Sequence, residues 1–99
     1  MGGHGLDPAV WEKIKATILT YPGVSAATLF GSRATGRFRA GSDIDIALEG
    51  ENLDLKDLNR ISILLDQLML PYQFDLVLRS YIQDPAVLLH ITQFGVPLG

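Results

Sequence analysis

Three aspartates lie in segments that otherwise have the composition of buried strands. Asp43 and Asp45 are two residues apart in the apolar segment 43–49, and Asp75 interrupts the apolar segment 73–78. Side chains two residues apart on a strand leave the same face of the sheet, so Asp43 and Asp45 would point toward one shared location. If the strand of Asp75 pairs beside theirs, all three carboxylates line one surface. Without a counterion these charges would repel one another, whereas Mg²⁺ prefers carboxylate oxygens and substrate phosphates as ligands.

A plainer interpretation of these aspartates is open. Two aspartates alternating on a strand more often mark a solvent-exposed face than a metal site, and Asp75 alone fits an edge strand equally well. The pair Gly31-Ser32, ten residues before Asp43, favours the metal interpretation. Gly31 allows a ligand to approach the backbone closely. Ser32 can cap the next short helix and present a hydroxyl and N–H groups to a phosphate.

Basic residues follow the Gly-Ser pair. Arg33, Arg37 and Arg39 lie within seven residues of one another, and guanidinium groups suit the charge of a triphosphate. The alternative for each arginine is a solvated loop position. His90 is expected on the outer side of the last helix and His4 lies near the start of the chain. Neither has a partner at a useful spacing, so neither is assigned a role.

The elements that must position these residues follow from hydrophobic periodicity and capping signals. Asp7-Pro8 and Asp84-Pro85 each combine an N-cap residue with a proline at the first helical position. The predicted elements, in order, are a helix from Pro8 that ends before 21–23, strands at 25–30 and 43–49, a helix over 55–68, a strand at 73–78 and a helix from Pro85 to Gly95. The predicted inner stripe of the last helix is Val87, Leu88, Ile91 and Phe94. This α-β-loop-β-α-β-α order predicts an α+β domain with a small sheet and helices packed against it.

The composition limits the class of protein. A chain of 99 residues with net charge −3 is one domain and does not have the basic footprint of a duplex-DNA-binding protein. The absence of cysteine excludes disulfides, thiolate metal sites and cysteine nucleophiles. No apolar run approaches the ~18 residues of a membrane span, and the start lacks a signal pattern. We predict a flexible leader at 1–6, a domain at 7–99 and a cytoplasmic location.

The order Gly-Ser, ten residues, Asp-x-Asp and a distant aspartate on a following strand resembles the DNA polymerase β-like nucleotidyltransferase superfamily. The stretch LFGSRATGRFRAGSDIDIALEG resembles its minimal branch, the MNT proteins of bacteria and archaea. The resemblance covers nearly the whole chain. It implies a mixed sheet with helices, two Mg²⁺ ions, an NTP with ATP as the expected donor, and transfer of a nucleoside monophosphate to an acceptor hydroxyl.

The resemblance also implies roles for individual residues. Those assigned to the nucleotide are Gly31, Ser32, Arg33 and Ser42, and those assigned to catalysis and metal binding are Asp43, Asp45 and Asp75. Asp75 completes the metal set and is also a candidate base toward the acceptor. The sequence departs from the family pattern at Thr35, where many members have arginine. This departure leaves open whether position 35 contacts a phosphate. It does not affect the roles assigned to the three carboxylates.

Two functions of different classes remain. In the first, the chain is an enzyme whose acceptor arrives on another molecule. In the second, it is a binding module that neutralises a partner, because members of this family are often encoded beside a helical HEPN-domain protein as its antitoxin. The intact Gly-Ser pair and the three aspartates favour retained catalysis.

A partner surface is predicted from the hydrophobic content of 47%, which exceeds what so short a chain readily buries. We expect the C-terminal end, or the first helix near Trp11, to contact a HEPN-type protein or a second copy of the chain. The apolar residues at the C-terminal end are Leu88, Leu89, Ile91, Phe94, Val96 and Leu98. The acceptor would be a Tyr, Ser or Thr hydroxyl of the partner, presented to the Asp75 side of the cleft. No membrane partner is expected.

Overall fold

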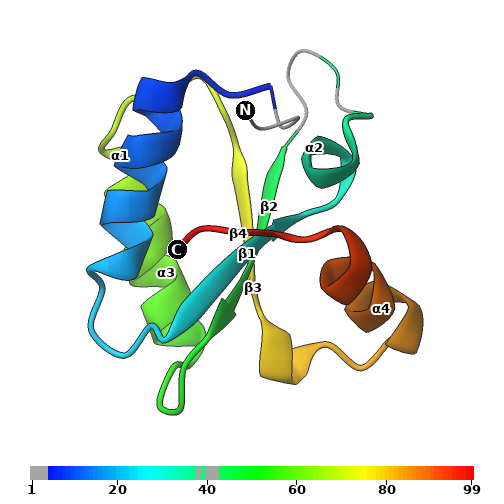
Figure 1. Cartoon of the computed structure of the whole chain (residues 1–99). Coiled ribbons are helices and arrows are strands. Elements are labelled where there is room, and N and C mark those ends of the chain that lie inside the picture. The colour runs from blue at the N-terminus through cyan, green and yellow to red at the C-terminus, as the bar shows by residue number, and fades with distance from the viewer. Residues whose placement is uncertain (1–4, 38, 40–42) are drawn as a thin grey trace.

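The fold is a four-stranded mixed sheet with helices on both sides (Figure 1). A computed structural model describes residues 5–37, 39 and 43–99. The helices are α1 (Pro8–Leu19), α2 (Ser32–Thr35), α3 (Leu55–Asp66) and α4 (Pro85–Phe94), with a 3₁₀ turn η1 (Arg79–Tyr81). The strands are β1 (Ala26–Phe30), β2 (Ile44–Glu49), β3 (Phe74–Leu78) and β4 (Val96–Pro97). The α+β class and the mixed sheet implied by the family resemblance are both confirmed.

Strand order in the sheet is β3-β2-β1-β4. β1 pairs antiparallel with both β2 and β4, whereas β2 and β3 run parallel. The end of β1 therefore meets the beginnings of β2 and β3 at one edge of the sheet. The residues predicted to do chemistry lie at this edge.

Side-chain caps fix where the longer helices begin. Asp7 accepts a hydrogen bond from the backbone N–H of Ala9 at 2.8 Å, and Asp84 accepts one from Ala86 at 2.9 Å. These caps satisfy N–H groups that the first turn of a helix leaves without a backbone partner. Both helices begin at the proline that follows the cap, as the sequence predicted.

The hydrophobic core lies between the sheet and the pair α1 and α3, on the left of the sheet in Figure 1. Ile44 and Ile46 of β2 point into this core and are fully buried. The buried cluster consists of Leu6, Ile14, Ile18, Ala27, Leu29, Ile44, Ile46, Leu48, Ile61, Leu65, Leu78 and Leu98. Because side chains alternate along a strand, Asp45 must face the other side, where α4 and α2 lie. One side of the sheet thus stabilises the domain and leaves the other for polar residues.

The structure differs from the sequence-based expectations in several places. The elements η1 and β4 were not predicted, since each is only two or three residues long, whereas the short helix expected beside Ser32 is α2. Phe94 was assigned to the inner stripe of the last helix, and this is wrong because its side chain is 52% exposed. Leu6, which was assigned to the leader, packs in the core. In the part of the chain that the structure describes, every helix is too short or too polar to cross a bilayer.

Replacing Ile46 tests whether this core is what holds the site strand in place. Ile46→Ala removes buried methyl groups from the face of β2 opposite Asp45, so the free energy of unfolding should fall by about 2–5 kcal/mol. Ile63→Ala, on the exposed face of α3, should change it by no more than about 0.5 kcal/mol. Equilibrium denaturation with urea measures both values. Equal effects would contradict the assignment of the core.

Candidate active site

The register of the parallel pair β2 and β3 brings two of the three aspartates together. Asp45 and Asp75 are direct partners across the two strands, so both side chains leave the same face. Asp43 immediately precedes β2, where the backbone N–H of Ile44 donates to the carbonyl of Gln73 at 2.9 Å. Asp43 and Asp75 are exposed, while Asp45 is half-buried. The structure thus gathers the three carboxylates at one edge of the sheet.

The surroundings of Asp45 raise the pKa of its carboxyl group. Burial, and then the negative charges of Asp75 and Asp43, raise the pKa of Asp45 from 3.8 to about 6, with a hydrogen bond to Asp75 as the smallest contribution. A raised pKa means that the ionised carboxylate is disfavoured in the folded protein. A cation bound at this edge would relieve that cost.

Gly31 brings the end of β1 against Asp45. Phe30 is the direct partner of Asp45, and the chain turns at the next residue. Gly31 has φ +80° and ψ −154°, a conformation that residues with a Cβ rarely adopt. A Cβ added there would overlap the Oδ2 atom of Asp45. Glycine is therefore required for the turn and the carboxylate to lie so close.

Ser32 begins the short helix α2 that follows this turn. The prediction that its side chain caps the helix is wrong, because Gly31 occupies the N-cap position and no side-chain cap is formed. The turn is closed instead by Thr35, whose hydroxyl donates to the carbonyl of Ser32 at 3.2 Å. Thr35, the departure from the family pattern, thus bonds to the backbone of the Gly-Ser turn.

The three arginines of the loop differ in their surroundings. Arg33 is only 2% exposed, and its guanidinium lies 5.1 Å from the ring centroid of Tyr72, which precedes β3. Burial excludes the solvated-loop alternative for Arg33 and gives it a role in holding α2 near the start of β3. Arg37 and Arg39 are exposed. Ser42 lies outside the described residues, so its assignment to the nucleotide stays a prediction.

His90, to which the sequence assigned no role, contacts the Gly-Ser turn. Its Nε2 atom accepts a hydrogen bond from the backbone N–H of Gly31 at 2.9 Å. The two residues are 59 positions apart, and histidine is too common on helices for the sequence to have signalled such a contact. The position of His90 on the outer side of the helix was predicted from the apolar stripe alone. That stripe does not predict that the Gly-Ser turn packs beside His90.

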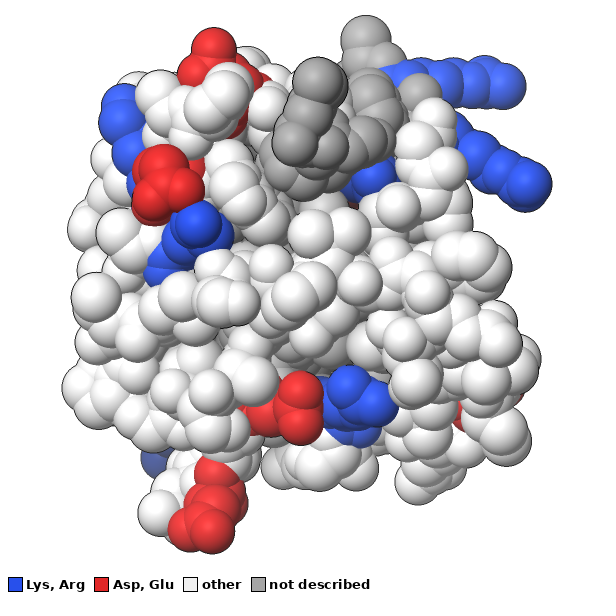
Figure 2. Space-filling model, viewed as in Figure 1, with Lys and Arg blue, Asp and Glu red and all other residues white. Residues whose placement is uncertain are grey.

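A pocket of about 660 Å³ adjoins the Gly-Ser turn. α2 and the turn supply one wall and α4 the other, and the lining residues are Gly31, Ser32, Ala34, Thr35, Arg37, His90 and Phe94. Its basic member is Arg37. Figure 2 shows basic side chains extending outward at the end of the molecule where α2 lies. A pocket with serine, backbone and arginine at one side suits an anionic ligand.

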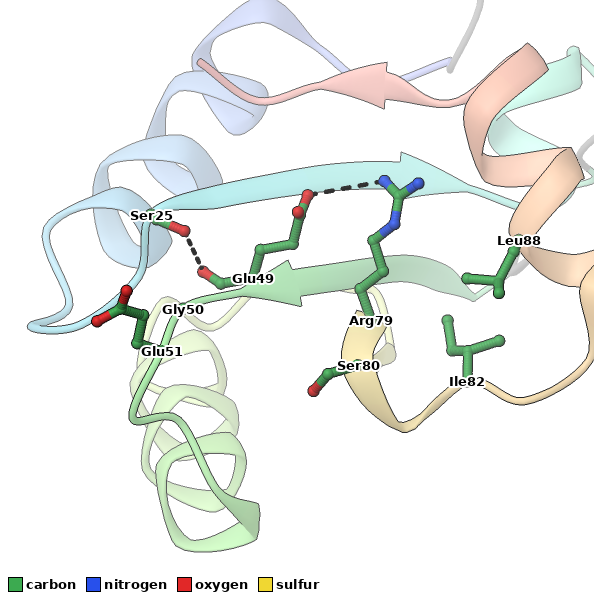
Figure 3. A pocket seen from close by; sticks show the side chains of 8 residues that line it. All are labelled: Ser25, Glu49, Gly50, Glu51, Arg79, Ser80, Ile82 and Leu88. Atoms are coloured by element: carbon green, nitrogen blue, oxygen red, sulfur yellow. Dashed lines mark hydrogen bonds and ion pairs between the residues drawn. The ribbon is translucent and has the colours of Figure 1, made fainter.

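A second pocket of about 580 Å³ lies at the opposite ends of β2 and β3 (Figure 3). It contains the ion pair between Arg79 and Glu49, whose atoms are 3.7 Å apart. Glu49 is four residues beyond Asp45 on the same strand, which is roughly 13 Å. Because Arg79 is already paired here and the three aspartates are distant, we place the candidate site at the Gly-Ser turn and the neighbouring aspartates and not in this pocket.

The three aspartates have the oxygen ligands that Mg²⁺ prefers. Among residues 5–37, 39 and 43–99, no three acidic, histidine or cysteine side chains form a ready-made metal cage. Mg²⁺ does not need one, because it usually binds through one or two carboxylates, water and substrate phosphates. Asp45 with Asp43 or Asp75 supplies such ligands, and burial together with the charges of Asp75 and Asp43 raises the pKa of Asp45. The residues therefore fit Mg²⁺ that is shared with a nucleotide.

The Gly-Ser turn follows a strand and faces carboxylates on two neighbouring strands, which is the arrangement that the family resemblance implied. The family model for polymerase β nucleotidyltransferases matches residues 12–98. The chain therefore belongs to the polymerase β nucleotidyltransferase family. Among curated proteins, none matches it.

Solved structures show the same fold. A chain of a toxin–antitoxin crystal structure with AMP-PNP is 24% identical with a TM-score of 0.74, and the match covers 90% of this chain and 72% of that one. A chain of the MntA–HepT toxin–antitoxin is 21% identical with a TM-score of 0.68, covering 94% and 72%. A chain in the complex of the tri-AMPylated Shewanella oneidensis HEPN toxin with MNT antitoxin is 22% identical with a TM-score of 0.68, covering 92% and 70%.

The pKa of Asp45 predicts how stability changes with pH. The folded protein holds a proton on Asp45 up to about pH 6, whereas the unfolded chain releases it near 3.8. The folded state thus binds more protons between these values, so the wild-type protein loses stability as pH rises through this window. Asp45→Asn cannot ionise and should be the more stable protein above about pH 6, with the advantage vanishing below about pH 4.

Denaturation of both proteins at several pH values measures this difference. Glu51→Gln, in an exposed turn distant from the site, serves as the control and should show no comparable gain. A difference between wild type and Asp45→Asn that stays constant with pH would contradict the proposed crowding of negative charge.

Proposed function

We propose that this chain transfers a nucleoside monophosphate, adenylyl from ATP, to a hydroxyl of a HEPN-type partner protein, in the manner of an antitoxin. The observation that carries the proposal is the contact between Gly31 and Asp45. It places a turn suited to phosphates directly beside carboxylates suited to Mg²⁺. A protein that only bound its partner would have no physical need for three neighbouring carboxylates.

Each residue has a part in the proposed reaction. The Gly31-Ser32 turn holds the phosphates of the nucleotide, and Arg37 offsets their charge from the pocket wall. Asp43 and Asp45, with Asp75, would hold Mg²⁺, which neutralises charge on the phosphates and activates the phosphorus toward attack. Two ions are expected from the family resemblance.

The transfer itself forms one bond and breaks one. The acceptor oxygen attacks the α-phosphorus, and the bond from that phosphorus to the oxygen bridging the β-phosphate breaks, so that pyrophosphate leaves. The hydroxyl proton passes to the carboxylate of Asp75, which is exposed and lies at the edge strand β3. An acceptor on a partner protein can reach this carboxylate from solvent.

The structural neighbours support the donor and the partner. One is a toxin–antitoxin with AMP-PNP, an analogue of ATP, and another contains a HEPN toxin that carries AMP groups. Since adenylyl transfer from ATP would produce such a modified protein, ATP is the donor proposed here. A nucleotide substrate and a HEPN-type partner follow from the same neighbours.

The partner surface is proposed on α4. Of the six apolar C-terminal residues, Ile91 and Leu98 are buried within the fold, while Leu89 and Phe94 are 56% and 52% exposed. α4 lies on the same side of the sheet as Asp45, since His90 contacts Phe30, the partner of Asp45 in the sheet. The face over α4 and β4 in Figure 2 carries almost no charged side chains. A protein docked there would lie beside the carboxylates.

Asparagine variants separate metal binding from chemistry. Mg²⁺ with ATP at a hundredfold excess over Kd should stabilise the wild type by about 2.7 kcal/mol, raising Tm by roughly 10 °C or more. Asp43→Asn and Asp45→Asn should lose most of this rise, because a carboxylate ligand is gone. Asp75→Asn should keep most nucleotide affinity while transfer falls ~100-fold or more, because it lacks the base.

Thermal melting and mass spectrometry of the partner after incubation with ATP and Mg²⁺ measure these outcomes, with Glu51→Gln as the control. Full retention of the rise in both Asp43→Asn and Asp45→Asn would refute the metal assignment. Equal loss of binding and transfer in Asp75→Asn would make it a metal ligand and not the base. A wild type that binds the partner but never modifies it would favour the neutralising binding module.

A charge on α4 tests the partner surface. Leu89→Asp should weaken the complex with the HEPN-type protein by ~10-fold or more, because an aspartate buried at an interface is desolvated without a partner. Ile63→Asp is the matched control, since Ile63 is also 56% exposed but lies on α3, across the sheet. Calorimetric titration gives both affinities, and sedimentation of the chain alone reports whether it forms a homodimer. A complex weakened by Ile63→Asp and not by Leu89→Asp would move the interface to α3.

A further inference from the structure

His90 is the residue of α4 that reaches the Gly-Ser turn. Its Nε2 atom lies 2.9 Å from the backbone nitrogen of Gly31, which has a hydrogen to donate. Nε2 must therefore act as the acceptor. A neutral imidazole has one donor and one acceptor nitrogen, so the ring proton resides on Nδ1.

Two aromatic rings hold the imidazole in this orientation. Phe30, the last residue of β1, meets it edge-on with ring centroids 6.4 Å apart. Phe94, one helical turn further along α4, lies 5.5 Å away in a tilted arrangement. The ring is thus packed by residues of both elements that the hydrogen bond connects. A contact supported in this way has a defined geometry and is more than a chance encounter of surface groups.

Gly31 is consequently fixed from two directions. Its N–H is held by His90, and its Cα lies against the carboxylate of Asp45. A glycine with φ +80° has access to many other conformations. Each restraint removes some of that freedom before a ligand arrives. The N–H of Gly31 belongs to the Phe30–Gly31 peptide plane, and Ser32 is joined to that plane through the φ and ψ angles of Gly31.

We propose that His90 is a positioning residue for nucleotide binding, whose neutral imidazole holds the Gly31 peptide so that the Gly31-Ser32 turn is already shaped for phosphates. This inference rests on the proposed function, since the shape of the turn matters only where a nucleotide binds it. His90 contributes no proton to the transfer. It lowers the entropy cost of ordering the turn, which is the usual effect of preorganisation on affinity.

The alternative is that His90 merely anchors α4 to the rest of the domain. A second side chain of α4 makes such an anchor elsewhere. Thr92 accepts a hydrogen bond from Arg79 at 3.2 Å, on the far side from the Gly-Ser turn. Removing this bond loosens α4 without touching Gly31, so Thr92 provides the matched control.

The first experiment measures the affinity for ATP by calorimetric titration and the transfer rate at saturating ATP. His90→Ala should raise Kd by about 3- to 10-fold, the effect of one lost hydrogen bond, and lower kcat by less than about 3-fold, because the carboxylates remain on their strands. His90→Gln should restore Kd to within about twofold, since its amide oxygen can accept from Gly31. Thr92→Val should leave Kd within about twofold of wild type.

Equal losses in His90→Ala and Thr92→Val would overturn the proposal in favour of a helix anchor. An unchanged Kd in His90→Ala, in a wild type that does bind ATP, would also overturn it. A wild type that binds no ATP would refute the proposed function instead.

The second experiment needs no variant and no nucleotide. Nuclear magnetic resonance of the isotope-labelled free protein near pH 8, where histidine is ordinarily neutral, reports which ring nitrogen of His90 carries the proton. A proton on Nδ1, with the Gly31 amide shifted as a hydrogen-bond donor and slow to exchange, is the expected result. A proton on Nε2 would overturn the proposal, because that nitrogen could not accept from Gly31.

Discussion

The repulsion between carboxylates on neighbouring strands is the constraint on which this structure depends. The parallel register of β2 and β3 sets Asp45 directly beside Asp75. Burial, which is the largest cause, and the charges of Asp75 and Asp43 together raise the pKa of Asp45 to about 6. The free protein therefore carries an electrostatic cost at the point where a metal-bound nucleotide would remove it.

The opposite side of the sheet makes this cost tolerable. Ile44 and Ile46 flank Asp45 in the sequence and are both fully buried against α1 and α3. Alternation along one strand thus separates a stabilising face from a functional face by a single residue. A shift of β2 by one position would exchange the two faces, placing carboxylates in the core and isoleucines in solvent. The hydrophobic pattern that fixes the register also fixes the site.

The sequence was informative wherever a residue's neighbours along the chain decide its environment. Periodicity and the Asp-Pro caps gave the helices α1 and α4, and alternation gave the strand of Asp45 with its orientation. The sequence could not show contacts between remote segments. The burial of Arg33 against Tyr72 and the bond from Gly31 to His90 both require knowledge of how α2 and α4 pack. Phe94 was misplaced for a related reason, because a short helix on a small sheet buries only part of its apolar stripe.

The departure from the family pattern at Thr35, and the burial of the neighbouring Arg33, affect how the Gly-Ser turn can bind an anion. Arg33, which follows the Gly31-Ser32 pair, packs against Tyr72 in the segment before β3. Its side chain is almost fully buried. Thr35 bonds to the turn's own backbone and brings no charge. Among the described residues that line the pocket, Arg37 is the remaining source of positive charge. In the proposed function, affinity for a nucleotide would then depend strongly on the backbone shape of the turn, and hence on the residues that hold Gly31, and less on a cluster of cations. This is why a neutral histidine from a distant helix carries weight in a site otherwise built from charges.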